Sequence, residues 1–405
     1  MGTALKFCMI TTFYPPYNFG GDGIYIYRLS NELAERGHSV DVIHCEDAFR
    51  LLQTEDLHGE FPNHPNVTIH RLKSRAGFLS PLFTQQTSVP FFKRTKIKRL
   101  LEATKYDVIH YHNISLIGVT ALRYGSAIKL YTIHEYWLVC PMHVLWKFDR
   151  EACTEKSCLR CQVTGKRPPQ LWRYTGLLQR MLRNVDAFIS PSQFTLKKHL
   201  KELNIPIRHI PHFLPRTELP EIGIARWRPY FLFVGRLERI KGAQNLIPVF
   251  RQLAQYDLLL AGEGAYANEL KKLAGESHHI RFLGRLSMGE LLTFYRQAIA
   301  VIAPSICYEV FGNIILEAFA MKTPVIVSNF GALPEVVRDS TGGFIYNNEA
   351  ELIAAIQALA KDPRLRNEMG EKGYQSYLQN WTADRHMEQY LGLIEELRQK
   401  RSASK

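Results

Sequence analysis

Short apolar runs alternate with segments of helical periodicity along the whole chain. In the first half these runs predict strands at Leu5–Ile10, Asp41–Cys45, Val67–Leu72, Asp107–His112, Lys129–His134 and Ala187–Ser190. In the second half they predict strands at 229–236, 258–261, 280–283, 298–304 and 325–327. Continuous apolar runs are typical of parallel strands buried on both faces. The pattern therefore predicts an α/β fold of two doubly wound parallel sheets, each covered by helices.

A proline-rich stretch, Arg208–Pro220, separates the two series and is the best candidate for a linker. We predict an N-terminal domain of residues 1–215, with a cysteine-containing insert near 140–169, and a C-terminal domain of residues 216–380. Residues 381–405 form a last segment with an amphipathic helix. Two domains suit a chain of 405 residues, since roughly 150 residues per domain is usual.

Composition and charge restrict the class of protein. The chain is 46% hydrophobic and 22% charged, as in ordinary soluble globular proteins. Its net charge of +13 indicates anionic partners, and diphosphates, anionic lipid surfaces and nucleic acid all qualify. No recognised nucleic-acid motif accompanies the charge, so we expect no nucleic-acid partner. Without a long apolar window or a signal-peptide pattern, we expect a cytoplasmic protein, with peripheral contact at the inner membrane face as an alternative.

The stretch Ser305–Met321 has the character of a ligand site. A buried strand is followed by a loop that carries Glu309, and a helix then opens at Gly312 and Asn313. The first amides of such a helix have no intrahelical acceptor and attract anions. Glu317 lies about one turn beyond Asn313 on the same face. Two acids beside exposed amides suit a nucleotide sugar, which has a diphosphate between two hydroxyl-rich rings.

Three other segments carry candidate binding groups. Gly20 and Gly21 precede a helix predicted from Ile24 and can approach a phosphate closely, but their spacing is not that of a dinucleotide-binding turn. Arg236 and Lys241 follow a strand and can neutralise a diphosphate without a metal. His134 follows another strand, at the edge where open α/β sheets bind ligands.

These segments together resemble the retaining glycosyltransferases of family four (glycosyltransferase group 1), which have the GT-B fold. The resemblance lies in four segments: the E-x7-E pair Glu309 and Glu317 with Phe311-Gly312 between them, the G-R-L-x-x-x-K-G string at 235–242, residues 29–43 after the Gly pair, and the H-E-Y-W string at 134–137. They occur in order along nearly the whole chain. The resemblance implies two Rossmann-like domains facing each other across a cleft, with the last helix crossing back to the first domain.

The resemblance also implies roles for individual residues. Glu309 and His134 would contact the transferred sugar, and Glu317 the ribose hydroxyls. Arg236, Lys241 and the amides after Phe311 would hold the phosphates. The full set of expected donor-binding residues is Gly20, Gly21, Gly262, Glu263, Arg285, Phe311, Gly312, Asn313, Ile314 and Glu317, with Arg285 near the base.

The predicted activity is transfer of a hexose, with retention of configuration, from a nucleotide sugar to a hydroxyl acceptor. UDP-sugars such as UDP-glucose are favoured as donors and GDP-sugars are the alternative. The expected acceptor is a saccharide or a lipid-linked saccharide in polysaccharide or glycolipid biosynthesis. No metal and no cofactor beyond the donor is expected. Two competing hypotheses remain: an epimerase or hydrolase of the same shape, and a nucleic-acid-binding protein.

Two features of the sequence are not explained by this predicted activity. Cys140, Cys153, Cys158 and Cys161 lie within the insert, and their spacing leaves open a structural zinc, free thiols or a redox-labile pair. The basic stretch Phe91–Leu101 has apolar residues interleaved. We favour a solvated helix face for it over contact with an anionic membrane or a phosphate-bearing acceptor.

Overall fold

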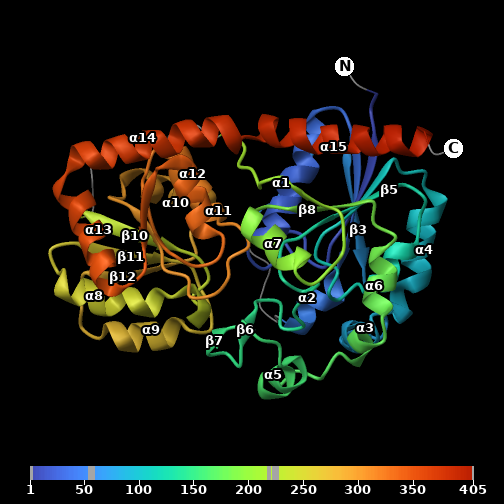
Figure 1. Ribbon diagram of the computed structural model, residues 1–405, viewed down its shortest axis with the longest axis horizontal. Helices are drawn as coiled ribbons and strands as arrows, with labels where there is room; N and C mark the ends of the chain where they lie inside the picture. Colours follow the sequence, from blue (N-terminus) through green and yellow to red (C-terminus); the bar gives the residue numbers. More distant parts are fainter. Residues whose placement is uncertain (1–2, 53–59, 217–219, 221–227, 404–405) are drawn as a thin grey trace. The chain divides into compact units, whose positions relative to one another are not determined.

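The computed structural model describes residues 3–52, 60–216, 220 and 228–403. The chain divides into two compact units: unit 1 comprises Met1–Ile210 and Met387–Lys405, and unit 2 comprises Pro211–His386. The boundaries thus fall at 210/211 and 386/387, whereas the sequence placed them at 215/216 and 380/381. Figure 1 shows the strands of each unit gathered in a layer with helices around it.

Unit 1 contains a seven-stranded sheet in the order β3-β2-β1-β4-β5-β8-β9, with every neighbouring pair parallel. Phe7 at its centre pairs with Val40 on one side and Val108 on the other. The strand order reverses at β1, since the chain first builds outward to β3 and then returns to β4. The strands are β1 Lys6–Ile10, β2 Ser39–Cys45, β3 Val67–Leu72, β4 Val108–Tyr111, β5 Ile128–Thr132, β8 Ala187–Ser190 and β9 Ile207–His209.

The helices of unit 1 cover this sheet and end in a long C-terminal helix, α15 (Ala383–Ala403), which is grouped with unit 1 from Met387. Tyr390 contacts His110 through its hydroxyl at 2.9 Å, and Arg401 pairs with Asp186 at 2.7 Å. The other elements are α1 Gly21–Glu35, α2 Glu46–Leu52, α3 Leu79–Thr87, η1 Phe91–Lys93, α4 Arg94–Ala103, η2 Val119–Arg123, β6 Trp146–Lys147, β7 Glu151–Ala152, α5 Cys158–Thr164, η3 Leu171–Tyr174, α6 Leu177–Leu182 and α7 Gln193–Leu200.

Unit 2 contains a six-stranded parallel sheet in the order β12-β11-β10-β13-β14-β15. Its two faces carry separate apolar cores, one with α10, α11 and α14, the other with α8, α9 and α13. The strands are β10 Tyr230–Val234, β11 Asp257–Ala261, β12 Ile280–Gly284, β13 Val301–Ala303, β14 Val325–Ser328 and β15 Gly343–Tyr346. The helices are η4 Arg239–Lys241, η5 Ala243–Asn245, α8 Leu246–Gln252, α9 Ala267–Ala274, α10 Met288–Gln297, α11 Asn313–Ala320, α12 Leu333–Ser340, α13 Glu349–Lys361 and α14 Pro363–Asn380.

The α/β class with two parallel sheets is confirmed. Four of the described strands were not predicted: β6 and β7, of two residues each, and the edge strands β9 and β15. The two edge strands are only partly buried, so they do not form the fully apolar runs of a central strand. Residues 217–219 and 221–227 lie outside the described part of the chain, so the linker is described only to residue 216 and at Pro220. Helix α1 begins at Gly21 rather than Ile24, after Gly20 with a positive φ of 71°. Among the described residues, no helix is both long and apolar enough to cross a bilayer.

Candidate active site

The loops at the centre of the unit 2 sheet come together where the strand order reverses. From β10 the chain adds β11 and β12 on one side, and then crosses to β13 on the other. The loop after β10 and the loop after β13 are joined by a hydrogen bond from the Ile306 amide to the Ile240 carbonyl, at 3.0 Å. Ligands of open α/β sheets bind at such a reversal, outside the carboxyl ends of the strands.

Glycines bring these loops within backbone contact. Gly242 has a φ of 76°, and a Cβ there would overlap the carbonyl oxygen of Pro304. Gly262 has a φ of 135°, and a Cβ there would overlap the carbonyl oxygen of Gly235. The Leu237 amide also donates to the carbonyl of Glu263, at 2.8 Å. The loop that carries Arg236 and Lys241 is therefore held from both sides.

Lys241 and Glu309 form an ion pair in this loop cluster. The Lys241 Nζ donates to the Glu309 Oε1 at 2.7 Å, and the Ser305 hydroxyl donates to the same oxygen at 2.6 Å. Their side chains are 26% and 19% exposed, so the pair is partly buried but still reachable from solvent. The sequence predicts that each residue contacts a ligand. It does not predict that the two side chains bind each other.

Each charge shifts the pKa of its partner. Burial alone would raise the pKa of Glu309, but the Lys241 ammonium, the two hydrogen bonds and the more distant Arg236 hold it below its ordinary value of 4.5. Burial opposes the charge of Lys241 as well, yet the Glu309 carboxylate keeps the pKa of Lys241 above 10.5. Both groups are therefore charged at neutral pH.

These shifts predict how the stability of unit 2 depends on pH. The lowered pKa of Glu309 adds stability that is fully present above 4.5 and is lost as the pH falls through its folded value. The raised pKa of Lys241 adds stability that is fully present below 10.5. We expect the melting temperature of the wild type to exceed that of the Lys241→Met/Glu309→Gln variant by a constant margin between about pH 6 and 9, shrinking below the carboxyl pKa. A margin that widens on acidification would contradict the pairing.

The other predicted cation, Arg236, lies near this pair but bonds elsewhere. Its Nη1 contacts the Glu238 Oε1 at 2.9 Å, and about half of its side chain is exposed. Glu263 and Arg285 follow β11 and β12 and are exposed. A surface depression lined by Asp339, Glu368 and Gln375 lies on other elements of unit 2, α12 and α14, and contains none of these residues.

Helix α11 begins beside the ion pair. Its N-cap is Gly312, with a φ of 132° and no side chain to accept the first-turn amides. Asn313 Oδ1 lies 3.1 Å from His212 Nδ1, and Ile314 packs against the core at the edge of the cluster. The helix therefore starts without a side-chain cap on its first amides. Such an end suits an anion, and the anion-binding role of these amides stays a prediction.

Glu317 and Phe311 are more deeply buried than a ligand-facing role suggests. Glu317 is 8% exposed, and its Oε2 accepts a 2.9 Å hydrogen bond from the Tyr295 hydroxyl. Phe311 belongs to the apolar core and meets the ring of His212 edge-on. Because its side chain fills the core, Phe311 can offer a ligand only its backbone.

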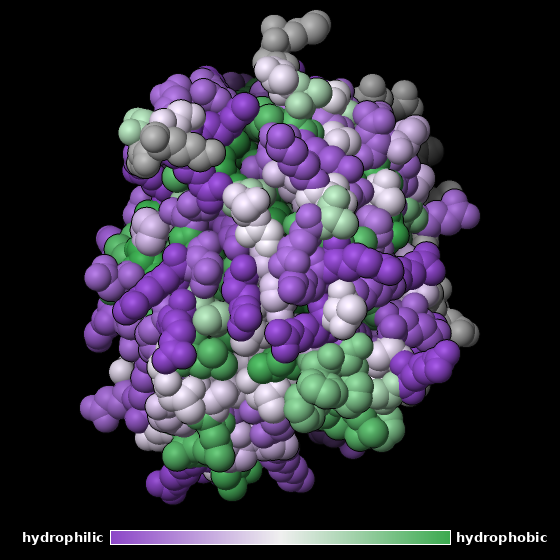
Figure 2. Space-filling view, turned by 90° about the vertical axis from the view of Figure 1, so that its right-hand side faces the viewer, coloured by the Kyte–Doolittle hydropathy of each residue, from purple (hydrophilic) through white to green (hydrophobic). Residues whose placement is uncertain are grey.

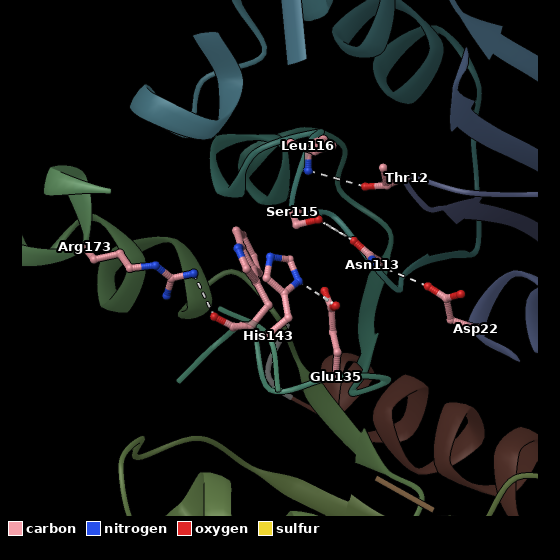
Figure 3. Close-up of polar contacts among 9 residues, drawn as sticks. Thr12, Asp22, Asn113, Ser115, Leu116, Glu135, His143 and Arg173 are labelled. Carbon is pink, nitrogen blue, oxygen red and sulfur yellow. Dashed lines mark hydrogen bonds and ion pairs between the residues drawn. The ribbon is translucent and has the colours of Figure 1, made fainter. Parts of the chain in front are cut away.

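A second set of polar residues lies where the strand order of unit 1 reverses, between β1 and β4 (Figure 3). Asn113 donates to Asp22 at 3.3 Å and accepts from the Ser115 hydroxyl at 2.7 Å. The Leu116 amide donates to the Thr12 hydroxyl at 3.4 Å. Asp22 stands in the first turn of α1, directly after Gly20 and Gly21. The start of α1 thus already carries a carboxylate, and the role of Gly20 and Gly21 as phosphate contacts remains a prediction.

His134 follows β5 in the same unit and is half-buried. Its Nε2 lies 3.0 Å from the Nδ1 of His112, which follows β4. The ring of Tyr25 packs against the ring of His134, with centroids 5.0 Å apart. The ring centroids of His110 and His112 lie 4.0 Å apart. His134 is therefore held by Tyr25 of α1 and by His112 at the end of β4.

The remaining residues of the H-E-Y-W string serve the framework. Glu135 bonds to His143 Nδ1 at 2.7 Å, as Figure 3 shows. Arg173 donates to the carbonyl of Trp137 at 2.8 Å and lies over its ring. Burial lowers the pKa of Arg173 to about 10. These contacts fix the loop from which His134 projects.

The four clustered cysteines are all unpaired thiols. In the part of the chain that the structure describes, no three His, Cys, Asp or Glu side chains are arranged to hold a metal ion. Since Cys140, Cys153, Cys158 and Cys161 are all described, they form no zinc ligand set here. Burial raises the pKa of Cys140, Cys153 and Cys158, which keeps these thiols protonated at neutral pH.

Comparison with known proteins agrees with this geometry. The family model for glycosyltransferase family 4 matches residues 19–218, and the model for glycosyl transferases group 1 matches residues 216–376. The chain belongs to the family-four, group 1 glycosyltransferases. It is 27% identical to the alpha-maltose-1-phosphate synthase of Mycobacterium tuberculosis, over 93% of this chain and 96% of that protein.

Solved structures show that this glycosyltransferase has the GT-B fold. The sucrose-phosphate synthase of Thermosynechococcus elongatus superimposes with a TM-score of 0.76 at 21% identity, covering 97% of this chain and 99% of that one. The Anabaena protein HepE, solved with UDP and glucose, superimposes with a TM-score of 0.69 at 18% identity, covering 97% and 100%.

Several residues that hold the candidate site together were not predicted from the sequence. Ser305 and Tyr295 hold the two acids of the E-x7-E pair, and His112 holds His134. Of these three residues, only His112 could have been predicted from the sequence, because it ends one predicted strand and His134 ends the next. Tyr295 lies on a different helix from Glu317, and nothing in the spacing joins them.

Proposed function

We propose that this glycosyltransferase moves a hexose from a nucleotide sugar to a hydroxyl acceptor with retention of configuration. The observation that carries the proposal is the Lys241–Glu309 ion pair at the strand reversal of unit 2, with Arg236 and the uncapped start of α11 beside it. Cations and free amides gathered around one acid suit a ligand that joins a diphosphate to a polyhydroxyl ring.

In this proposal the cations act on the leaving group. The bond between the sugar C1 and the diphosphate oxygen breaks, and negative charge develops on that oxygen. Arg236, Lys241 and the amides of Gly312, Asn313 and Ile314 stabilise the charge as it forms. Because they are positive or donate hydrogen bonds, the step needs no metal, and we expect transfer to continue at full rate in the presence of a chelator.

The remaining groups orient the donor. Glu309, held by Ser305, accepts from sugar hydroxyls once the diphosphate has drawn Lys241 toward itself, and His134 contacts the same sugar. Glu317, fixed by Tyr295, accepts from the ribose hydroxyls. The acceptor hydroxyl bonds to C1 on the face that the diphosphate leaves, and its proton passes to a phosphate oxygen. Retention follows from this same-face exchange.

We favour a UDP-sugar as donor, in line with the UDP and glucose bound to HepE, and a saccharide or lipid-linked saccharide as acceptor. The first test is thermal unfolding of the full chain with UDP-glucose, UDP-GlcNAc, UDP-galactose and GDP-mannose. The true donor, at 100 times its Kd, is expected to stabilise the protein by about 2.7 kcal/mol. Stabilisation by none of the four would count against the proposal.

A second measurement separates transfer from the competing reactions. Donor consumption that needs an acceptor, with product anomers matching the donor by NMR, is the expected result. Consumption without acceptor would instead favour an epimerase or hydrolase of the same fold.

A further inference from the structure

Exposed apolar side chains concentrate on one small part of unit 1. Of the fourteen large apolar side chains that are exposed among the described residues, six lie between residues 78 and 92. We call these six the apolar patch: Phe78, Leu79, Leu82, Phe83, Phe91 and Phe92. Monomeric soluble proteins usually expose such residues singly, so a cluster of this kind marks an interaction surface.

The patch is built from α3 and η1. Phe78, Leu79, Leu82 and Phe83 follow one another at helical spacing on one side of α3. The ring of Phe83 lies 5.6 Å from that of Phe91 and 5.9 Å from that of Phe92, so both elements contribute to one surface. The rings remain 41%, 62% and 46% exposed.

A buried ion pair holds this surface in place. The Lys93 Nζ lies 3.0 Å from Asp47 Oδ2 and donates to the Ser80 hydroxyl of α3 at 2.6 Å. Lys93 is thus a structural residue, and the interpretation of 91–101 as a solvated helix face is wrong at this position. Ile97 and Leu101 of α4 face the core of unit 1, which leaves Phe91 and Phe92 outside it.

Positive charge surrounds the patch. Residues 71–105 contain nine Lys or Arg and a single acid, Glu102. Eight of the nine, all but Lys93, are exposed. Figure 2, which faces the side where α3 and α4 lie in Figure 1, shows apolar residues gathered low on this face, with hydrophilic residues above them. Apolar and basic groups therefore share one face of unit 1.

We propose that this face docks on an anionic lipid bilayer, with the apolar patch inserted at the headgroup boundary and the basic residues against the lipid charges. A bilayer offers both kinds of contact together. A second copy of the chain would bring two basic surfaces into contact. Nucleic acid is a weaker fit, because the rings pack edge-to-face at 76° and 87° and leave aliphatic side chains beside them rather than separate stacking faces.

The proposal goes beyond the transfer reaction and does not depend on it. The test is sedimentation of the full chain with vesicles of phosphatidylcholine alone, or with about 30 mol % phosphatidylglycerol, in the absence of any donor. We expect binding to the anionic vesicles, weak binding to the neutral ones, and release as salt is raised to about 0.5 M.

Two variants remove the two contributions separately. Phe91→Ser/Phe92→Ser is expected to weaken binding to anionic vesicles by at least about tenfold. Arg94→Glu/Arg99→Glu is expected to weaken it by a similar or larger factor. Control variants in unit 2, Leu273→Ser and Lys361→Glu/Arg364→Glu, change residues of the same chemical kinds that are also exposed, and they should bind as the wild type does. All these side chains are exposed, so melting temperatures should stay unchanged and show that each variant folds.

Four results would overturn the proposal. The first is no sedimentation of the wild type with anionic vesicles, and the second is binding by both patch variants that equals that of the wild type. The third is a wild-type dimer in light scattering that Phe91→Ser/Phe92→Ser converts to a monomer without any vesicle binding, which would assign the patch to self-association. Displacement from vesicles by a single-stranded oligonucleotide alone, and not by free lipid vesicles, would assign it to nucleic acid.

Discussion

Replacing Lys241 with methionine is expected to lower kcat for sugar transfer by a factor of about 10² to 10³. The methionine keeps much of the length and apolar character of the side chain but removes the ammonium that lies 2.7 Å from Glu309. Charge on the departing diphosphate develops only in the transition state, so the loss should appear in kcat more than in the KM for the donor. Steady-state kinetics with the identified donor measure both.

The matched control is Lys361→Met, which removes a charge from an exposed position at the end of α13. It should leave both constants unchanged. Glu309→Gln is a useful companion, because it keeps an acceptor for Ser305 while removing the negative charge. If Lys241→Met raised KM and left kcat intact, Lys241 would serve only ground-state binding, and its assigned role at the leaving group would fail.

The strand pattern was the most predictable part of the molecule. Buried parallel strands read as continuous apolar runs, and Val67–Leu72 and Ala187–Ser190 match the structure at both ends. β9 and β15 were not predicted because they are partly buried edge strands, which lack the fully apolar run of a central strand. Gly176, with a φ of 72°, separates η3 from α6 because its left-handed geometry interrupts helical continuation.

The sequence predicted which segments form the candidate site, but it did not predict most of the side-chain contacts within it. Parallel strands bring their carboxyl ends to one edge, so the loops of Lys241 and Glu309 were expected to meet. Their direct ion pair depends on side-chain length and on the backbone approach at Gly242, neither of which is visible in the spacing. The burial of Glu317 against Tyr295 and the exposure of Phe91 likewise follow from how distant elements pack.

Gly242→Ala is expected to be among the most damaging single substitutions in unit 2. The residue combines a φ of 76° with a position where a Cβ would overlap the Pro304 carbonyl oxygen, which is backbone and cannot rotate away. Left-handed geometry alone costs a side chain roughly 1 to 2 kcal/mol, and the displaced loop adds to that cost. We expect a total near 3 to 5 kcal/mol and a fall in melting temperature of the order of 10 °C.

Gly284→Ala separates the two causes. Gly284 lies in the same unit with a similar φ of 68°, but nothing stands within 4 Å of its Cβ position. It should therefore show only the conformational cost, a fall of a few degrees. Because Gly242 directly follows Lys241, the clash should also move the ammonium away from Glu309, so Gly242→Ala should lose transfer activity even below its melting temperature. Equal effects of the two substitutions would mean that the loop after β10 moves freely past β13, and the close approach that builds this site would then not be required.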